Sequence, residues 1–256
     1  MLLRAYATSP LRLLMPRNHG HAAWVYTSSF GGGFVDRDRI ALDIEVAPGA
    51  SLFLSSQAST KVYRSVEGSH ARLDARVAND SLLVVAADPV VLFAHARFDQ
   101  RQTFDVASGG RLVVVDWMTS GRRESGERWA FTQYANRLDL RLGGARLAYE
   151  TMRLSREDGE LALRLGRFDV LAFVVIAGTA LASRTESLLM AHAHEPVRDR
   201  PGQLCVAAPL THPTLGPAGC VLRIAGRTVD DVGRTIRSAL GFVPGLLGDD
   251  PWARKW

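Results

Sequence analysis

A repeating alternation of apolar and polar residues is the feature of this sequence that most constrains its fold. In RIALDIEV, residues 39–46, large apolar residues occupy every second position. A period of two places those side chains on one face of a β-strand. Pro48 and Gly49 interrupt the pattern, which resumes at residues 51–54. The segment therefore predicts a strand, a turn and a second strand.

The same pattern recurs along much of the chain of 256 residues. Residues 138–151 predict a hairpin with Gly143 and Gly144 at its turn. We also expect strands in LALRL, residues 161–165, and in RFDVLAFVVI, residues 167–176. Short strands about ten residues apart, without a regular alternation of strand and helix, predict a mainly β protein whose strands stack as a coil or a sandwich.

Two segments carry helix signals. Residues 183–195 start at Ser183 and have Glu186 three residues later, which is a capping-box pattern. Residues 228–240 start at Thr228, with aspartates in the first turn and arginines in later turns. We therefore expect two α-helices near these bounds. No low-complexity linker divides the chain, so we expect a single domain over residues 1–256.

Composition narrows the class of protein. The hydrophobic content of 47% and charged content of 22% are typical of a soluble globular protein. The net charge of +5 allows an acidic partner such as nucleic acid or a lipid surface, but the arginines alternate with apolar residues instead of forming a block. The sequence has two cysteines, no apolar run of 18 residues and no signal-peptide pattern. We therefore predict a cytoplasmic protein that binds neither nucleic acid nor membrane.

The sequence contains no recognisable catalytic motif. It lacks a phosphate-binding P-loop, a Gly-x-Gly-x-x-Gly turn after a strand, a nucleophile elbow and a His-Glu-x-x-His pair. Asp36 and Asp38 are two residues apart at a strand entry, a spacing that suits paired acids in a glycosidase or a hard-metal site. Solvated strand ends are the favoured interpretation of this pair, and a binding or scaffold protein is favoured over an enzyme.

Histidines are the other group considered for metal binding. His19 and His21 form a His-x-His pair near the N-terminus, whereas His192 and His194 fall in an expected helix, where residues i and i+2 diverge. A surface or capping role is favoured for His19 and His21, and His192 with His194 is weak as a bidentate metal-binding unit. The sequence closes no complete metal site and implies no tightly bound cofactor.

Tryptophan and arginine mark one further segment, DWMTSGRRESGERWAF, residues 116–131. These residue types dominate the energetics of protein interfaces. We therefore predict a partner surface at Trp117, Arg122, Arg128 and Trp129. The alternative is an exposed connection that its tryptophans anchor to the core.

Several of these segments, in this order, resemble the family of urease accessory protein UreD, called UreH in some bacteria. The resemblance rests on GGGFVDRDRI at residues 31–40, QASTKVYRS at 57–65, ADPVVLFAHARFDQ at 87–100 and SGRRESGERWAF at 120–131, with PWARKW closing the chain. QASTKVYRS is the most specific of them. Three positions depart from the family pattern, with Arg37 and His95 in place of glycines and Leu92 in place of a proline.

The resemblance implies a mainly β protein with a helix-like stack of short strands and two helices. It implies an accessory chaperone without turnover of its own, which helps to insert nickel into apo-urease. The expected partners are a UreF-like protein, a UreG-like GTPase and apo-urease, and the assembly allows a dimer. Nickel in transit is the only metal expected. The alternative is a β-helical carbohydrate-active enzyme that uses dispersed carboxylates.

The resemblance further implies an internal passage for nickel. Transfer requires weak, exchangeable sites, so scattered carboxylates and hydroxyls suit a hydrated divalent cation. SSQASTKVYRS, residues 55–65, is expected to be a strand with a polar face that lines such a passage or contacts a partner. Our candidates for the passage wall are the acidic and hydroxyl side chains of these segments: Asp38, Ser59, Thr60, Tyr63, Asp88 and Glu127. His95 adds a weak potential ligand near this route.

Overall fold

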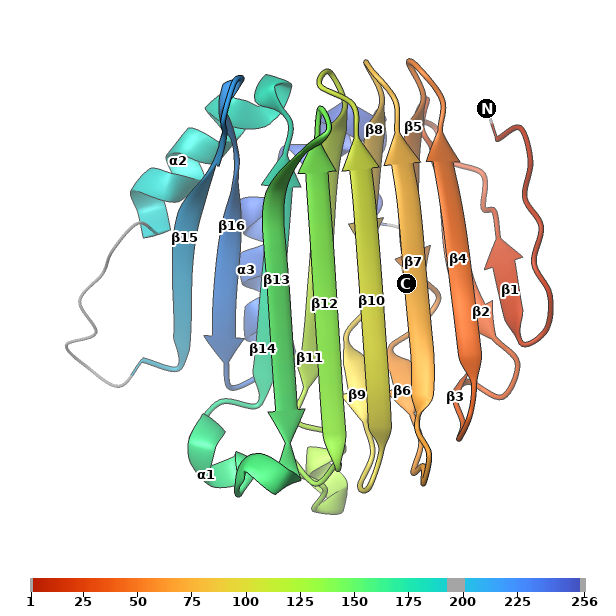
Figure 1. The fold of residues 1–256 in the computed structure, drawn as a ribbon, viewed down its shortest axis with the longest axis vertical. Coiled ribbons are helices and arrows are strands. Elements are labelled where there is room, and N and C mark those ends of the chain that lie inside the picture. The colour runs from red at the N-terminus through yellow and green to blue at the C-terminus, as the bar shows by residue number, and fades with distance from the viewer. Residues whose placement is uncertain (1, 193–200, 254–256) are drawn as a thin grey trace.

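The alternating segments form strands that are divided between two facing β-sheets (Figure 1). The computed structural model describes residues 2–192 and 201–253. The first sheet runs in the order β1 (Leu11–Leu14), β2 (Ala23–Ser29), β5 (Ser51–Ser56), β8 (Leu82–Ala86), β11 (Arg111–Thr119), β14 (Val170–Ala177), β16 (Gly216–Gly226) and β15 (Gln203–His212). The second runs in the order β13 (Ala145–Ser155), β12 (Gln133–Leu142), β10 (Arg97–Val106), β7 (Ser69–Val77) and β4 (Arg39–Val46).

The N-terminal half is a β-solenoid. The chain runs through the first sheet, then a short strand, then the second sheet, and repeats this path. The short strands β3 (Gly33–Phe34), β6 (Thr60–Val62) and β9 (Val90–Leu92) pair with one another in parallel. In the first sheet Ala23 pairs with Leu52, Leu52 with Leu83, and Leu83 with Leu112, steps of 29, 31 and 29 residues. This stack confirms the predicted mainly β, helix-like architecture.

The C-terminal half closes the stack with antiparallel strands. β12 and β13 form the predicted hairpin around Gly143 and Gly144, both of which have positive φ. β14, β16 and β15 extend the first sheet. The ring of His212 in β15 bonds the carbonyl oxygen of Leu142 at 2.9 Å, and Arg223 of β16 pairs with Glu150 of β13. These contacts join the two sheets at this end of the solenoid.

The two predicted helices are present as α2 (Ala182–His192) and α3 (Val229–Ala239), and α1 (Leu161–Leu165) and α4 (Val243–Leu247) are additional short helices. The cap of α3 is confirmed, because the Thr228 hydroxyl accepts a hydrogen bond from the Asp231 amide at 3.1 Å. Ser183 lies inside α2 and does not cap it, because a 3₁₀ turn at Thr179–Leu181 leads directly into the helix. Residues 193–195 of the predicted helix lie outside the described residues.

Two local predictions were wrong. LALRL forms α1, not a strand, since only Leu161 of this segment is buried and the other side chains do not need a buried sheet face. Only Thr60–Val62 of the segment 55–65 is a separate strand, because residues 57–59 bend where the chain leaves β5 for the short sheet. The segment therefore turns a corner of the solenoid.

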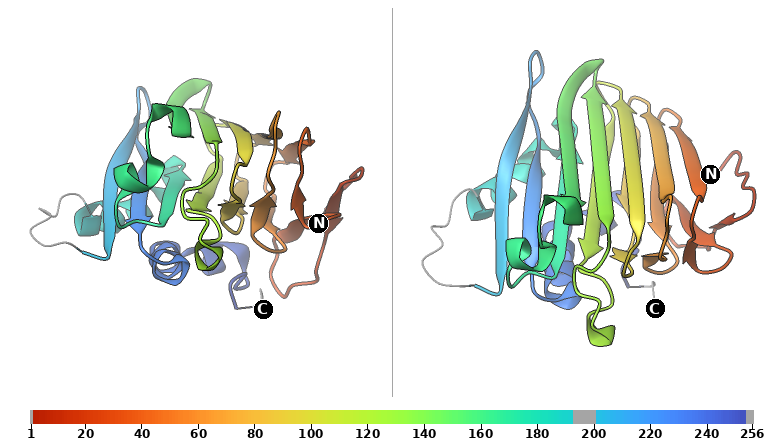
Figure 2. Two further views of the ribbon diagram at one scale, coloured as in Figure 1. Left: turned by 90° about the horizontal axis from the view of Figure 1, so that it is seen from below. Right: turned by 60° about the horizontal axis from the view of Figure 1, so that its bottom comes forward.

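Apolar residues form three clusters. One lies between the first sheet and α3 and α4, which cover its outer face (Figure 2). The other two lie between the facing sheets. In β10, Phe98 belongs to one of these and Phe104 to the other, and in β11 Met118 and Val114 are divided in the same way. The inward-facing positions between the two clusters are polar, and they form the belt described next.

Candidate functional site

A cavity of about 340 Å³ lies inside the solenoid, between the two inner apolar clusters. Its wall includes the end of β5, the bend before β6, and parts of β7, β10 and β11. Each of these elements comes from a different part of a coil, so residues about 30 positions apart in the sequence meet around one space. The stacking of coils therefore creates the cavity.

A buried carboxylate is the main charged group of this cavity. Asp116 of β11 is 8% exposed and accepts hydrogen bonds from three side-chain amides. Gln102 Nε2 lies 2.7 Å from one carboxylate oxygen, and Gln100 Nε2 lies 3.2 Å from both. Asn136 of the neighbouring strand β12 is the third donor. Among the described residues, no ion pair to Asp116 is found.

The electrostatics of Asp116 follow from this environment. Burial raises the pKa of the Asp116 carboxyl above its usual value, and the three amide donors only partly oppose that effect. Burial raises the pKa of the Tyr134 hydroxyl well above its usual value, and the nearby Asp116 charge adds to this effect. A buried carboxylate that is held by neutral donors has a net affinity for a positive species, either a proton or a metal cation.

Hydroxyl groups continue the polar belt from coil to coil. Thr27 of β2 pairs in register with Ser56 of β5, and the Thr27 hydroxyl donates to the Ser55 carbonyl oxygen at 3.2 Å. The Ser56 hydroxyl accepts from the Asp88 amide at 2.8 Å, one coil further on. Ser55 likewise donates to the Ala86 carbonyl oxygen at 2.7 Å. These contacts give the cavity a wall of oxygen atoms where the strands end.

Three of the six predicted passage residues line this cavity: Ser59, Thr60 and Asp88. The other three lie elsewhere. Asp38 accepts a hydrogen bond from the Val35 amide at 2.9 Å in the preceding turn. A route past Asp38, Tyr63 and Glu127 stays a prediction.

Tyr63 and Glu127 belong to a corner cluster with Phe93 and Arg122. The Tyr63 ring meets Phe93 edge to face, with centroids 5.0 Å apart, and the Arg122 guanidinium lies 4.1 Å above the same ring. Glu127 accepts from Arg122 and from the Ala94 amide, and these contacts lower the pKa of its carboxyl against the effect of burial. The cluster ties the loop after β11 to the corners of two preceding coils.

The sequence interpretation missed the amide cluster around Asp116. A signal was available, because Gln100 and Gln102 are two residues apart in β10 and interrupt the apolar inward face between Phe98 and Phe104. Asp116 interrupts the apolar run of β11 in the same way. The sequence did not show that these interruptions face one another.

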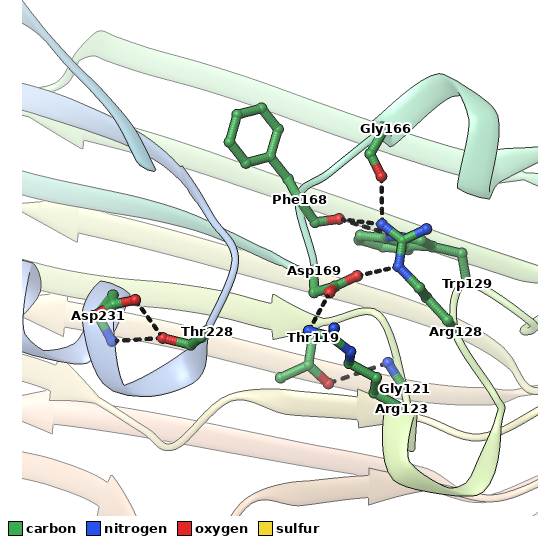
Figure 3. A network of polar contacts seen from close by, with 10 residues as sticks. All are labelled: Thr119, Gly121, Arg123, Arg128, Trp129, Gly166, Phe168, Asp169, Thr228 and Asp231. Carbon is green, nitrogen blue, oxygen red and sulfur yellow. Dashed lines mark hydrogen bonds and ion pairs between the residues drawn. The ribbon is translucent and has the colours of Figure 1, made fainter. Parts of the chain in front are cut away.

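The predicted partner-surface residues contact their own chain, as Figure 3 shows for two of them. Trp129 is 2% exposed and donates to the Phe168 carbonyl oxygen at 3.0 Å. Arg128 pairs with Asp169, which also binds Arg123 at 3.0 Å. Trp117 donates to the Ala87 carbonyl oxygen at 2.8 Å and is partly buried. These contacts anchor the loop, and a partner surface at this loop stays a prediction.

Of the histidines considered as ligands, His19, His21 and His95 are exposed, His192 is half-buried at the end of α2, and His194 lies outside the described residues. His19 and His21 lie beside the C-terminal turn, where the His19 amide donates to Asp249. His95 lies at the corner of a coil. Among the described residues, no group of three His, Cys, Asp or Glu side chains is placed to hold a metal ion.

Arg37 and His95 retain the backbone shape that the glycines of the family pattern suggest. Their φ angles are +70° and +63°, in the left-handed region that glycine adopts most easily. The Arg37 amide donates to the Gly68 carbonyl oxygen, and the His95 amide to that of Ala130. Both turns are therefore kept, at a cost in backbone strain.

The charged outer face of the second sheet consists largely of paired arginines. Arg72 lies 3.1 Å from Asp43 and 3.2 Å from Asp74, and Arg76 lies 3.2 Å from Glu45. This arrangement fits solvated strand faces. Within residues 2–192 and 201–253, no helix is long and apolar enough to cross a membrane.

Comparisons with known proteins agree on one family. A family model described as "UreD urease accessory protein" matches residues 1–256. A protein named "Urease accessory protein UreD" from Sorangium cellulosum (strain So ce56) is 46% identical over 256 residues, which cover all of this chain and 80% of the relative. One of the same name from Anaeromyxobacter sp. (strain Fw109-5) is 38% identical, over 99% of this chain and 84% of the relative.

A plant protein is also similar. "Urease accessory protein D" from Oryza sativa subsp. indica is 32% identical over 274 residues, which cover 97% of this chain and 90% of the relative.

Proposed function

Because the chain belongs to the UreD family of urease accessory proteins, we propose that it acts in the maturation of urease as a scaffold without turnover of its own. In this role it supports the insertion of nickel into apo-urease and gives the ion a passage through the solenoid. The observation that supports a passage is the polar cavity at Asp116.

The chemistry of the cavity suits a divalent cation in transit. Asp116 offers a carboxylate, and the amide oxygens of Gln100, Gln102 and Asn136 become available if those groups rotate. Ser59 and Thr60 add hydroxyl oxygens nearby. Dispersed carboxylates such as Asp116 and Asp88, with neutral oxygen donors between them, bind a hydrated ion weakly, as transfer requires, whereas a complete shell of His or Cys ligands would retain it.

The proposed partners are a UreF-like protein, a UreG-like GTPase and apo-urease. Names of relatives such as "Urease accessory protein UreD" support a place in urease maturation. Arg122 is the most exposed of the four predicted partner-surface residues, with 44% of its side chain exposed. Its stacking on Phe93 holds the guanidinium in a fixed position, which favours recognition of a partner carboxylate or carbonyl.

The alternative, a carbohydrate-active enzyme, is not favoured. The carboxylates considered for it are each engaged by local hydrogen bonds: Asp36 with the Glu67 and Gly68 amides, Asp38 with the Val35 amide, and Glu127 with Arg122. Hydrogen bonds from backbone amides, that of Gly68 first, lower the pKa of Asp36, so this group is a poor general acid near neutral pH.

The experiment is nickel-dependent activation of apo-urease by the accessory complex, with wild-type chain, Asp116→Asn, and Asp105→Asn as a matched control. Asp105 is an exposed aspartate of β10, in the facing sheet. We expect Asp116→Asn to slow activation while the accessory partners still co-purify, and Asp105→Asn to leave the rate unchanged. Equal activation rates for all three chains would contradict a nickel passage past Asp116. Normal urease maturation in a host that lacks the chain would remove the scaffold role.

A further inference from the structure

The second sheet ends in an unpaired edge at β4. β4 pairs only with β7 among the described residues. The Asp38 carbonyl oxygen accepts from the His70 amide, and that of Val46 accepts from the Ala78 amide. Because a parallel ladder uses alternate residues, the even-numbered residues of β4 bond to β7. The odd-numbered residues Arg39, Ala41, Asp43 and Glu45 therefore direct their backbone N–H and C=O groups to the free edge.

A groove runs along this free edge. Its volume is about 1500 Å³, and it lies between residues 2–11 and the whole length of β4. Figure 1 shows the N-terminal segment beside β4 at this end of the solenoid. Leu3 and Tyr6, which line the groove, are 79% and 77% exposed. An unpaired edge beside a groove that is lined by both apolar and charged side chains suits the addition of a further strand.

The charges of β4 are self-complementary, which means that two antiparallel copies of this strand place opposite charges next to each other. In an antiparallel pair centred on Leu42, Arg39 lies opposite Glu45 of the second strand, and Ile40 lies opposite Ile44. The edge-directed residues then face one another, as antiparallel hydrogen bonding requires. Outward residues also stay outward, whereas a shift that places Leu42 opposite Asp43 would mix the two faces.

We propose that a second copy of this chain adds its β4 to this edge, antiparallel and centred on Leu42, across a two-fold axis. The two second sheets then form one continuous sheet, with Arg39–Glu45 pairs at both ends of the seam. Such a closed interface is the usual form of a homodimer. Glu45 already pairs with Arg76 of its own chain, but both side chains are nearly 80% exposed, so Glu45 remains accessible to the second copy.

The test is the molar mass of the full chain in solution, by light scattering after gel filtration over about a hundredfold range of concentration. Arg39→Glu and Glu45→Arg each place like charges opposite one another twice, and we expect each to raise the dimer Kd at least about tenfold. The double variant Arg39→Glu/Glu45→Arg restores opposite charges, and we expect it to dimerise as the wild type does.

Two controls isolate the edge. Arg137→Glu changes an exposed arginine on β12, and Arg76→Ala removes the internal partner of Glu45, so neither should change the dimer Kd. A monomeric wild type at every concentration would overturn the proposal. So would single variants that dimerise normally, or a double variant that stays monomeric. Because the assay uses no urease or nickel, its failure leaves the proposed function in place.

Discussion

The two non-glycine residues at left-handed turns allow a direct test of how this chain keeps the solenoid corners. Arg37 and His95 have φ angles of +70° and +63°. For a residue with a Cβ atom this conformation costs about 1–2 kcal/mol. Replacement by glycine relieves that strain but adds about 0.5–1 kcal/mol of backbone entropy to the unfolded chain. We expect a net gain in unfolding free energy of about 0.5–1 kcal/mol for Arg37→Gly and for His95→Gly.

The contacts that the side chains lose do not reverse this sign. Arg37 pairs with Glu67, but the two side chains are 72% and 58% exposed, so the pair adds little stability. The His95 side chain is exposed, and the hydrogen bonds of His95 with the Ala130 carbonyl oxygen and the Ser65 amide involve its backbone. The backbone term therefore decides the outcome at both positions.

The assay is urea unfolding followed by tryptophan fluorescence, since Trp129 and Trp24 are buried. Arg37→Ala and His95→Ala are the matched controls, because they remove the same side chains and keep the Cβ atom. The unfolding free energy of each glycine variant should exceed that of its alanine counterpart. Its Tm should be higher by about 2–4 °C for each kcal/mol of that difference. Glycine variants no more stable than the alanine variants would refute the assignment of strain to these turns.

Three further outcomes follow from other parts of the structure. The raised pKa of Asp116 means that ionisation of this carboxyl opposes folding. The unfolding free energy of the wild type should therefore fall relative to that of Asp116→Asn as pH rises above 3.8, and the difference should then stay level. Urea unfolding at a series of pH values would show this, and parallel curves for the two chains would contradict it. Asp169→Asn should cost about 2 kcal/mol in the same assay at pH 7, because Asp169 is the buried partner of Arg128; an unchanged midpoint would exclude this anchor. Gly219→Ala should cost about 3 kcal/mol or more, since its Cβ would meet the Ile176 carbonyl oxygen at 1.9 Å; wild-type yield and Tm would show that the strands can separate there.

Local predictions succeeded where one segment carried the whole signal. The hairpin at Gly143 and Gly144 was predictable because both turn residues have positive φ, which glycine permits. The cap at Thr228 was predictable because its hydroxyl binds an amide three residues later. LALRL failed because five residues with alternating leucines fit a strand or a short helix equally well, and the surrounding chain decided between them.

The sequence by itself determined the strands, their inward and outward faces, and through the quoted motifs the resemblance to the UreD family. Alternation of apolar and polar residues is a local property, so the sequence of each strand indicates which of its faces is buried. Only the tertiary structure decided which inward polar residues meet. Asp116 meets Gln100 and Asn136 because the two sheets face each other, and the 16 and 20 residues that separate them in the sequence exceed the reach of any local pattern.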